Sequence, residues 1–164
     1  MRGLITFSAA VALAGCASSS SVPLAQDVVQ ISARTAPICG QQGAEKVAFK
    51  QAAVETIRRG FDRFIIVGGQ YRDDVRVVGR TPVTAQTYGT ATATGYGNTV
   101  AATGTATTYY SGGHPIIGGA HRQGFVVKMF KAGDPEGVKA ISARAELGAD
   151  WEKIVKSDTA TCFD

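Results

Sequence analysis

A chain of 164 residues, 45% of them hydrophobic, has the length and the apolar content of one globular domain. Its 17 basic and 13 acidic residues give a net charge of +4, and the basic residues are scattered along the chain. A nucleic-acid groove needs clustered basic residues, so this distribution excludes one and indicates solubility or weak attraction to anionic surfaces.

The N-terminus is built like a secretory leader. Met1 and Arg2 are followed by a dozen mostly apolar residues, 3–14, a run too short to cross a bilayer as a helix. The leader ends in LAGC at residues 13–16, which resembles the lipobox of bacterial lipoproteins. The resemblance implies that residues 1–15 are removed as a signal peptide and that acyl chains on Cys16 hold the protein on a membrane. The alternative is an ordinary cleaved leader that happens to contain a cysteine.

Residues 16–26 are small and polar and contain one proline, a composition that predicts a flexible, serine-rich tether. The residue after the cysteine is Ala17. In similar lipoproteins of Gram-negative bacteria, Asp at this position favours retention in the inner membrane. The resemblance therefore implies an anchor in the outer membrane, with the protein facing the periplasm.

Two further cysteines, Cys39 and Cys162, stand far apart in the chain. In an oxidising compartment such a pair predicts a disulfide that ties the C-terminal tail to the body. The alternatives are a reactive thiol or a metal-binding pair, but neither cysteine has a CxxC partner or a neighbouring histidine.

The first half of the body alternates strand and helix patterns. Residues 27–37 place Val29, Ile31 and Ala33 on one side of a strand. Residues 44–59 have helical spacing and stop before Gly60. A short apolar run at 61–69 indicates a buried strand, and residues 73–80 are expected to extend the sheet.

The second half repeats the order. Residues 122–130 predict a strand, residues 134–148 a helix capped by Asp134, and residues 151–155 a last strand. The order β-α-β-(long insertion)-β-α-β predicts an α+β two-layer sandwich of ferredoxin-like order, with a mainly antiparallel sheet and two helices on one face. Residues 27–164 are then a single α/β domain.

The insertion at residues 81–113 is rich in Thr, Gly and Tyr and contains no Asp, Glu, Lys or Arg. Thr and Tyr favour strands whereas repeated Gly and Ala weaken register, so the segment is either a long frayed hairpin or a mobile loop. Arginines flank it and are expected to act as gatekeepers against aggregation: Arg72, Arg76, Arg80 and Arg122.

Four of the five tyrosines lie inside this insertion: Tyr88, Tyr96, Tyr109 and Tyr110. Together with the threonine hydroxyls they are candidates for a contact surface that binds a sugar polymer or a partner protein. The competing interpretation is a tolerated insertion at a hairpin tip without a binding role.

The residues that could carry enzyme chemistry are few. His114 and His121 are the only histidines, and neither has an acidic or thiol neighbour at metal-ligand spacing. Asp73 and Asp74 would point to opposite sides of a strand and are more typical of a turn. The chain carries none of the common hydrolase, protease, nucleotide or dinucleotide motifs, so we expect no cofactor, no metal and no catalytic residue.

Three segments, taken together with the lipobox at residues 13–16, carry a further resemblance. Residues 52–67, the sequence GFVVKMFKAGDP at 124–135 and ARAELG at 143–148 resemble a family of small bacterial lipoproteins of uncharacterised function. The resemblance implies a periplasmic α/β body and brings no catalytic residues. We therefore expect a non-enzymatic, lipid-anchored envelope protein that binds another envelope protein or a cell-wall polymer and no nucleic acid. The alternatives are a periplasmic hydrolase with a site around His114 and His121, and a surface-exposed adhesin or sensor.

Overall fold

The computed structural model describes residues 17–157 together with 161 and 162. These residues form two compact units. We call the first the body; it contains the described residues up to Val75 and from Gly119 onward. The second, the insertion unit, is Arg76–Gly118.

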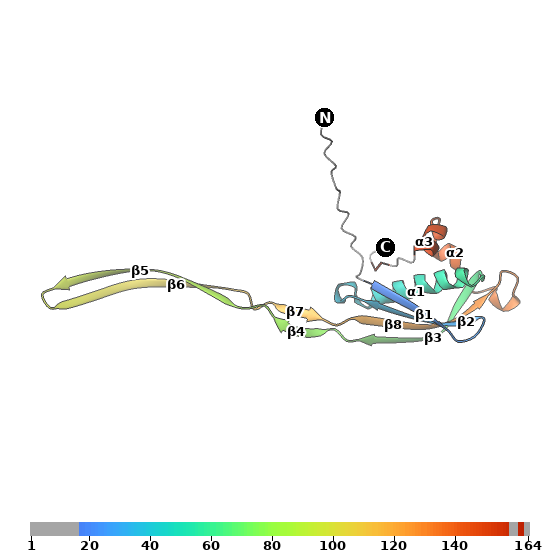
Figure 1. Ribbon diagram of the computed structural model, residues 1–164, viewed down its shortest axis with the longest axis horizontal. Coiled ribbons are helices and arrows are strands. Elements are labelled where there is room, and N and C mark those ends of the chain that lie inside the picture. The colour runs from blue at the N-terminus through green and yellow to red at the C-terminus, as the bar shows by residue number, and fades with distance from the viewer. Residues whose placement is uncertain (1–16, 158–160, 163–164) are drawn as a thin grey trace, which may run out of the picture. The chain divides into compact units, whose positions relative to one another are not determined.

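In the described part of the body, five strands form one sheet, in the order β1-β2-β8-β3-β9, in which neighbouring strands are antiparallel. The strands are β1 (Ala17–Pro23), β2 (Val28–Thr35), β3 (Arg63–Asp73), β8 (His121–Phe130) and β9 (Ile141–Ser142). Figure 1 shows helix α1 (Gly40–Arg58) lying along one face of this sheet. A mixed α/β class with a mainly antiparallel sheet is thus confirmed.

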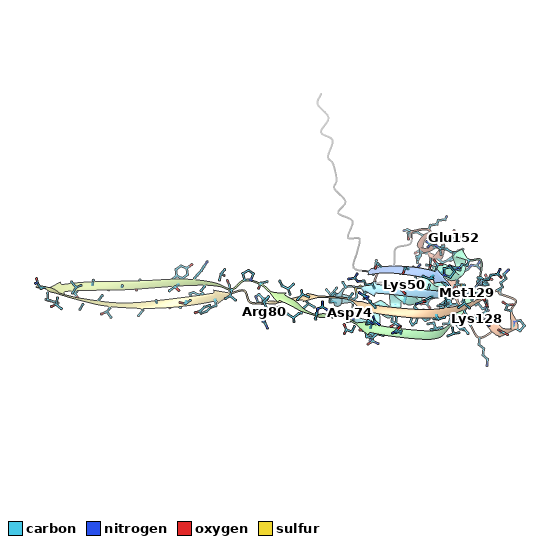
Figure 2. The ribbon with its side chains drawn as sticks, turned by 60° about the horizontal axis from the view of Figure 1, so that its bottom comes forward. Lys50, Asp74, Arg80, Lys128, Met129 and Glu152 are labelled. Carbon is cyan, nitrogen blue, oxygen red and sulfur yellow. A yellow bond between two sulfur atoms is a disulfide. The ribbon has the colours of Figure 1, made fainter. Side chains whose placement is uncertain are left out.

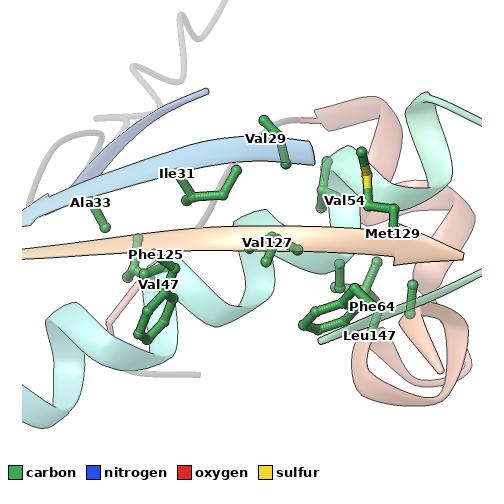
Figure 3. Close-up of a cluster of buried hydrophobic side chains, with 14 of the residues drawn as sticks. Val29, Ile31, Ala33, Val47, Val54, Phe64, Phe125, Val127, Met129 and Leu147 are labelled. Carbon is green, nitrogen blue, oxygen red and sulfur yellow. The ribbon is translucent and has the colours of Figure 1, made fainter. Parts of the chain in front are cut away.

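The core lies between α1 and the sheet (Figure 3). Alternate residues of β2 and β8, such as Ile31 and Val127, are fully buried against the helix, as the period of two predicts. On the helix, Ala44, Ala48 and Ala52 are fully buried at intervals of four residues. Their small side chains let the helix approach the sheet closely while Phe64 fills the space near its C-terminal half.

The predicted tether differs from the structure. Ala17–Pro23 is strand β1, which pairs antiparallel with β2 from Ala17 opposite Thr35 to Pro23 opposite Val29. The backbone of β1 pairs with the edge of β2, which would otherwise be open. The Ser19 hydroxyl also donates a 2.9 Å hydrogen bond to Oε1 of Gln51 on α1. A polar run with no apolar alternation thus becomes a strand through pairing.

The helix predicted over 134–148 is replaced by three short elements. Pro135–Gly137 is a 3₁₀ turn, Ile141–Ser142 is strand β9 beside β3, and helix α2 is only Ala143–Leu147. The Asp134 carboxylate accepts a hydrogen bond from the Lys131 amide, at 3.1 Å, and so closes a turn instead of capping a helix. The N-cap of α2 is Ser142, whose hydroxyl accepts from the Ala145 amide.

The last predicted strand, at residues 151–155, is also wrong. This segment is helix α3 (Trp151–Ser157), in which the Asp150 carbonyl accepts from the amides of Lys153 and Ile154. Trp151, Ile154 and Val155 pack against the core at helical spacing, and this burial decides the conformation. The ferredoxin-like order is not confirmed, because its last strand is this helix and β1 pairs with β2 instead.

The insertion unit contains two antiparallel strand pairs. One joins β4 (Arg76–Arg80) to β7 (Pro115–Gly118), so residues 76–80 do not extend the sheet of the body as predicted. The other is a hairpin of β5 (Thr84–Tyr96) and β6 (Thr99–Ser111). Gly97, with a φ of 61°, supplies the left-handed residue of its tight turn. Of the two interpretations of residues 81–113, the structure therefore has the long hairpin.

Candidate functional site: a two-faced hairpin

The β5–β6 hairpin has two chemically different faces. Its register runs continuously from Thr84 opposite Ser111 to Tyr96 opposite Thr99. Because successive side chains in a strand point to opposite sides, the even residues of β5 share a face with the odd residues of β6. We call this the Thr/Tyr face: Thr84, Gln86, Tyr88, Thr90, Thr92, Thr94 and Tyr96, with Thr99, Ala101, Thr103, Thr105, Thr107, Tyr109 and Ser111.

The opposite side, the Ala/Gly face, is made of smaller side chains: Ala85, Thr87, Gly89, Ala91, Ala93 and Gly95, with Val100, Ala102, Gly104, Ala106, Thr108 and Tyr110. Gly89 and Gly104 are required on this face because the two strands approach closely there. A Cβ at Gly104 would lie 2.8 Å from the Thr90 carbonyl oxygen, and one at Gly89 would lie 3.0 Å from that of Thr105. The middle of this face is consequently flat.

On the Thr/Tyr face, a ring contact and a side-chain hydrogen bond orient the aromatic groups. The rings of Tyr88 and Tyr109 meet edge to face with centroids 6.3 Å apart, and the Tyr88 hydroxyl donates to Oε1 of Gln86 at 3.1 Å. At the base of the hairpin, the hydroxyls of Thr84 and Ser111 are 2.7 Å apart. Aromatic surface next to ordered hydroxyls is suited to contacts with sugars or with polar protein surfaces.

The structure brings three of the four predicted tyrosines onto one face and separates the fourth. Tyr88, Tyr96 and Tyr109 lie on the Thr/Tyr face, whereas Tyr110 lies on the Ala/Gly face. All four are exposed; Tyr109 retains 64% and Tyr110 75% of the accessible surface of a free residue. Figure 2 shows side chains projecting from both faces along the length of the hairpin.

The hairpin gains almost nothing from burial. Every residue of β5 and β6 is exposed, and a lone two-stranded hairpin is at best marginally stable in water. Its outer edges present unpaired backbone groups, and residues 81–113 contain no charged side chain that would repel an approaching strand. A surface of this size and composition can therefore gain stability by binding.

The two histidines belong to different units. In the insertion unit, the His114 amide donates to Oγ1 of Thr81 at 2.9 Å, as part of a loop. In the body, Nδ1 of His121 lies 2.6 Å from the Tyr71 hydroxyl and 3.5 Å from Oδ1 of Asp73. The structure thus gives His121 an acidic neighbour that the sequence spacing did not reveal.

The His121 cluster has the character of a structural contact. Both neighbours use the same ring nitrogen, and the His121 side chain is only 11% exposed. Desolvation, and secondarily the charge of Asp73, raise the pKa of Tyr71 above its ordinary value, so its hydroxyl stays protonated at neutral pH. A protonated phenol is a hydrogen-bond donor and a weak nucleophile, so the cluster is better suited to fixing the end of β3 than to covalent catalysis.

The predicted cysteine pair is bonded in the structure. Cys39 and Cys162 form a disulfide with a Cα–Cα distance of 5.8 Å across 123 positions of sequence. Cys16, the predicted lipidation site, lies outside the described residues. Within the described residues, His, Cys, Asp and Glu side chains nowhere gather in a group of three that could hold a metal ion.

No protein-family model matches the chain, and no curated protein or solved structure was found to be similar to it. Among the helices in the described part of the chain, none combines the length and the apolar character needed to cross a membrane.

Proposed function

We propose that this chain is a lipid-anchored protein of the bacterial cell envelope that acts by binding. Its anchor is the set of acyl chains on Cys16, supported by the lipobox-like LAGC at residues 13–16. The mature protein faces the periplasm, with Ala17 after the cysteine favouring the outer membrane. The disulfide between Cys39 and Cys162 is of the kind that persists in such an oxidising compartment.

One observation carries the binding role. The hairpin of β5 and β6 exposes every residue, contains no charge, and gathers Tyr88, Tyr96 and Tyr109 with a ladder of threonine hydroxyls on one face. Exposed aromatic groups with few rotatable bonds bind partners at a low entropic cost, and neighbouring hydroxyls supply adaptable hydrogen bonds. The hairpin is therefore the element that contacts a cell-wall polymer or another envelope protein.

Site-specific photo-crosslinking in the host tests this role. The full chain carries p-benzoylphenylalanine at Thr92, on the Thr/Tyr face, or at Lys139, an exposed position of the body. We expect a defined adduct from position 92 and none from position 139. Absence of an adduct from position 92 and from a second position on the same face, Thr103, would contradict the proposal.

A periplasmic hydrolase is the second candidate, favoured by the contact of His121 with Tyr71 and Asp73. It requires His121 to act on a substrate, and the low exposure of its side chain argues against this. The His121→Gln variant separates the two functions. The binding proposal expects unchanged crosslinking from Thr92, whereas loss of a hydrolytic activity in the same variant would favour the enzyme.

A further inference from the structure

The face of the body sheet that α1 leaves uncovered carries a row of three arginines. Arg34 on β2 is directly opposite Arg122 on β8, and Arg122 is directly opposite Arg72 on β3. Adjacent strands are about 4.8 Å apart, so three guanidinium groups start from backbone positions within about 10 Å. Their neighbours in sequence, such as Ala33 and Gln123, are buried on the α1 side.

This row is electrostatically unfavourable by itself. Like charges directly opposite on neighbouring strands repel each other. The Arg122 Nε lies 3.3 Å from Oδ2 of Asp74, but within the described residues neither Arg34 nor Arg72 forms an ion pair or a side-chain hydrogen bond. One carboxylate thus faces three guanidinium groups, and the row retains an excess of positive charge.

The arginines border a hollow of about 500 Å³. Beside them it is lined by hydroxyl and amide groups, among them Ser18, Ser32 and Gln70. Gly124 stands in the next row of the sheet, between Ser32 on one side and Gln70 on the other. Because residue 124 has no side chain, the centre of the hollow is open: a Cβ there would meet nothing closer than the Gln70 carbonyl oxygen at 3.6 Å.

We propose that this hollow binds a phosphate-bearing ligand, with the phosphate between Arg34, Arg72 and Arg122. Guanidinium groups bind phosphate oxygens in a planar, bidentate manner, and several phosphate oxygens can be shared among adjacent arginines. The serine and glutamine side chains then bind the polar remainder of the ligand. The negative charge of the bound phosphate offsets the repulsion among the three arginines. A ligand in the hollow should therefore raise the stability of the body. The site lies wholly in the body and is independent of the role proposed for the hairpin.

Phosphate groups of this kind occur on soluble molecules and on lipid headgroups, and two probes distinguish the sources. The full chain with Cys16→Ser, which cannot be lipidated, is titrated with sodium pyrophosphate while backbone amide resonances are followed by NMR. In parallel, its binding to phosphatidylcholine vesicles is compared with and without 20% phosphatidylglycerol. We expect shifts centred on Ser32, Gln70 and Gly124, and weaker binding as the salt concentration rises.

Three variants test the geometry. Arg72→Gln removes one unpaired guanidinium and should weaken binding about tenfold, the effect of losing a charge-assisted hydrogen bond. Gly124→Val keeps every charge and fills the hollow, so it should weaken binding by a similar factor. Arg76→Gln, an exposed strand arginine of the insertion unit, makes the same charge change elsewhere and should leave the affinity within about twofold.

Arg72→Gln should also raise the melting temperature of the ligand-free protein, because the repulsion in the row is reduced. The shift in melting temperature produced by a given concentration of pyrophosphate should be smaller in this variant, because it binds the ligand about tenfold more weakly. Pyrophosphate binding that is weakened by Arg72→Gln and Gly124→Val but not by Arg76→Gln supports a soluble ligand. Binding only to vesicles with phosphatidylglycerol, lost in Arg72→Gln, supports a lipid headgroup. Binding of neither probe, or equal effects of Arg72→Gln and Arg76→Gln, would overturn the proposal.

Discussion

Cys39, just before α1, is bonded to Cys162 near the C-terminus, and the Cβ atoms of both residues lie over Gly43 in the first turns of the helix. A Cβ placed at Gly43 would be 2.8 Å from that of Cys39 and 3.1 Å from that of Cys162. Cys162, the disulfide and the beginning of α1 are therefore packed as one contact.

Removing the disulfide should lower the free energy of unfolding of the body by about 3 to 5 kcal/mol, because the bond closes a loop of more than a hundred residues. Urea unfolding of Cys39→Ser/Cys162→Ser, in a Cys16→Ser background, measures the loss. Dithiothreitol should reproduce it in the Cys16→Ser parent and have no effect on the triple variant. An unfolding midpoint insensitive to both changes would contradict this role.

The Gly43→Ala variant should destabilise the body by about 1 to 3 kcal/mol, although alanine ordinarily favours a helix over glycine. The added methyl group must displace the disulfide or the helix. Thermal unfolding with and without reductant checks the cause, since the destabilisation should become smaller when the disulfide is reduced and Cys162 can move away from residue 43. Gln42→Ala, at the neighbouring exposed position, serves as the control and should have little effect. A stabilised Gly43→Ala protein would show that the contact is absent.

Glycine positions in the hairpin allow a similar comparison within the insertion unit. In Gly104→Ala the new Cβ would approach the Thr90 carbonyl oxygen to 2.8 Å, whereas in Gly95→Ala the nearest atom is 3.9 Å away. We expect faster amide hydrogen exchange across β5 and β6 in the first variant, no acceleration in the second, and unchanged exchange in the core strands of the body. Equal effects of the two variants would contradict the register described here.

Ionisation of Tyr71 should lower the free energy of unfolding of the body at alkaline pH. Its pKa is raised in the folded protein, chiefly by desolvation and then by Asp73, so the folded state holds the proton more tightly than the unfolded state. The resulting stabilisation is complete below the unfolded pKa of about 10 and is lost as the pH rises through the folded pKa. In Tyr71→Phe this part of the alkaline loss should disappear. Urea midpoints between pH 8 and 11.5 that fall equally in both proteins would contradict the assignment.

Strong periodic patterns in the sequence predicted the centre of the body correctly. The alternation in β2 and β8 and the helical spacing of α1 reflect burial on one face, and burial is a property that a single segment displays. The segment 151–155 is a helix and not a strand because five residues with apolar side chains only at Trp151, Ile154 and Val155 fit either structure, and packing against the core decides. The serines of β1 show no such pattern, since their conformation comes from the β2 edge.

The sequence predicts the two candidate sites, the hairpin faces and the arginine row, less well than it predicts the core. Composition marked the insertion, but the two faces of the hairpin depend on which β6 residue lies opposite each β5 residue, and thus on the position of the turn at Gly97. The alternation of Thr with Ala and Gly in residues 90–95 was the available signal. Arg34, Arg72 and Arg122 are scattered in the sequence, where Arg72 and Arg122 stand out only as charges that flank the insertion. The pairing of β2, β8 and β3 brings the three together.

The binding role of the hairpin is tested most directly by two neighbouring residues on its opposite faces. Photo-crosslinking from Thr92 is measured in the full chain carrying Tyr109→Ser or Tyr110→Ser, substitutions of the same type in adjacent positions of β6. We expect the adduct yield to fall at least about fivefold with Tyr109→Ser, as for a contact worth about 1 kcal/mol, and to be maintained with Tyr110→Ser. Equal yields in the two variants would contradict a binding surface on the Thr/Tyr face.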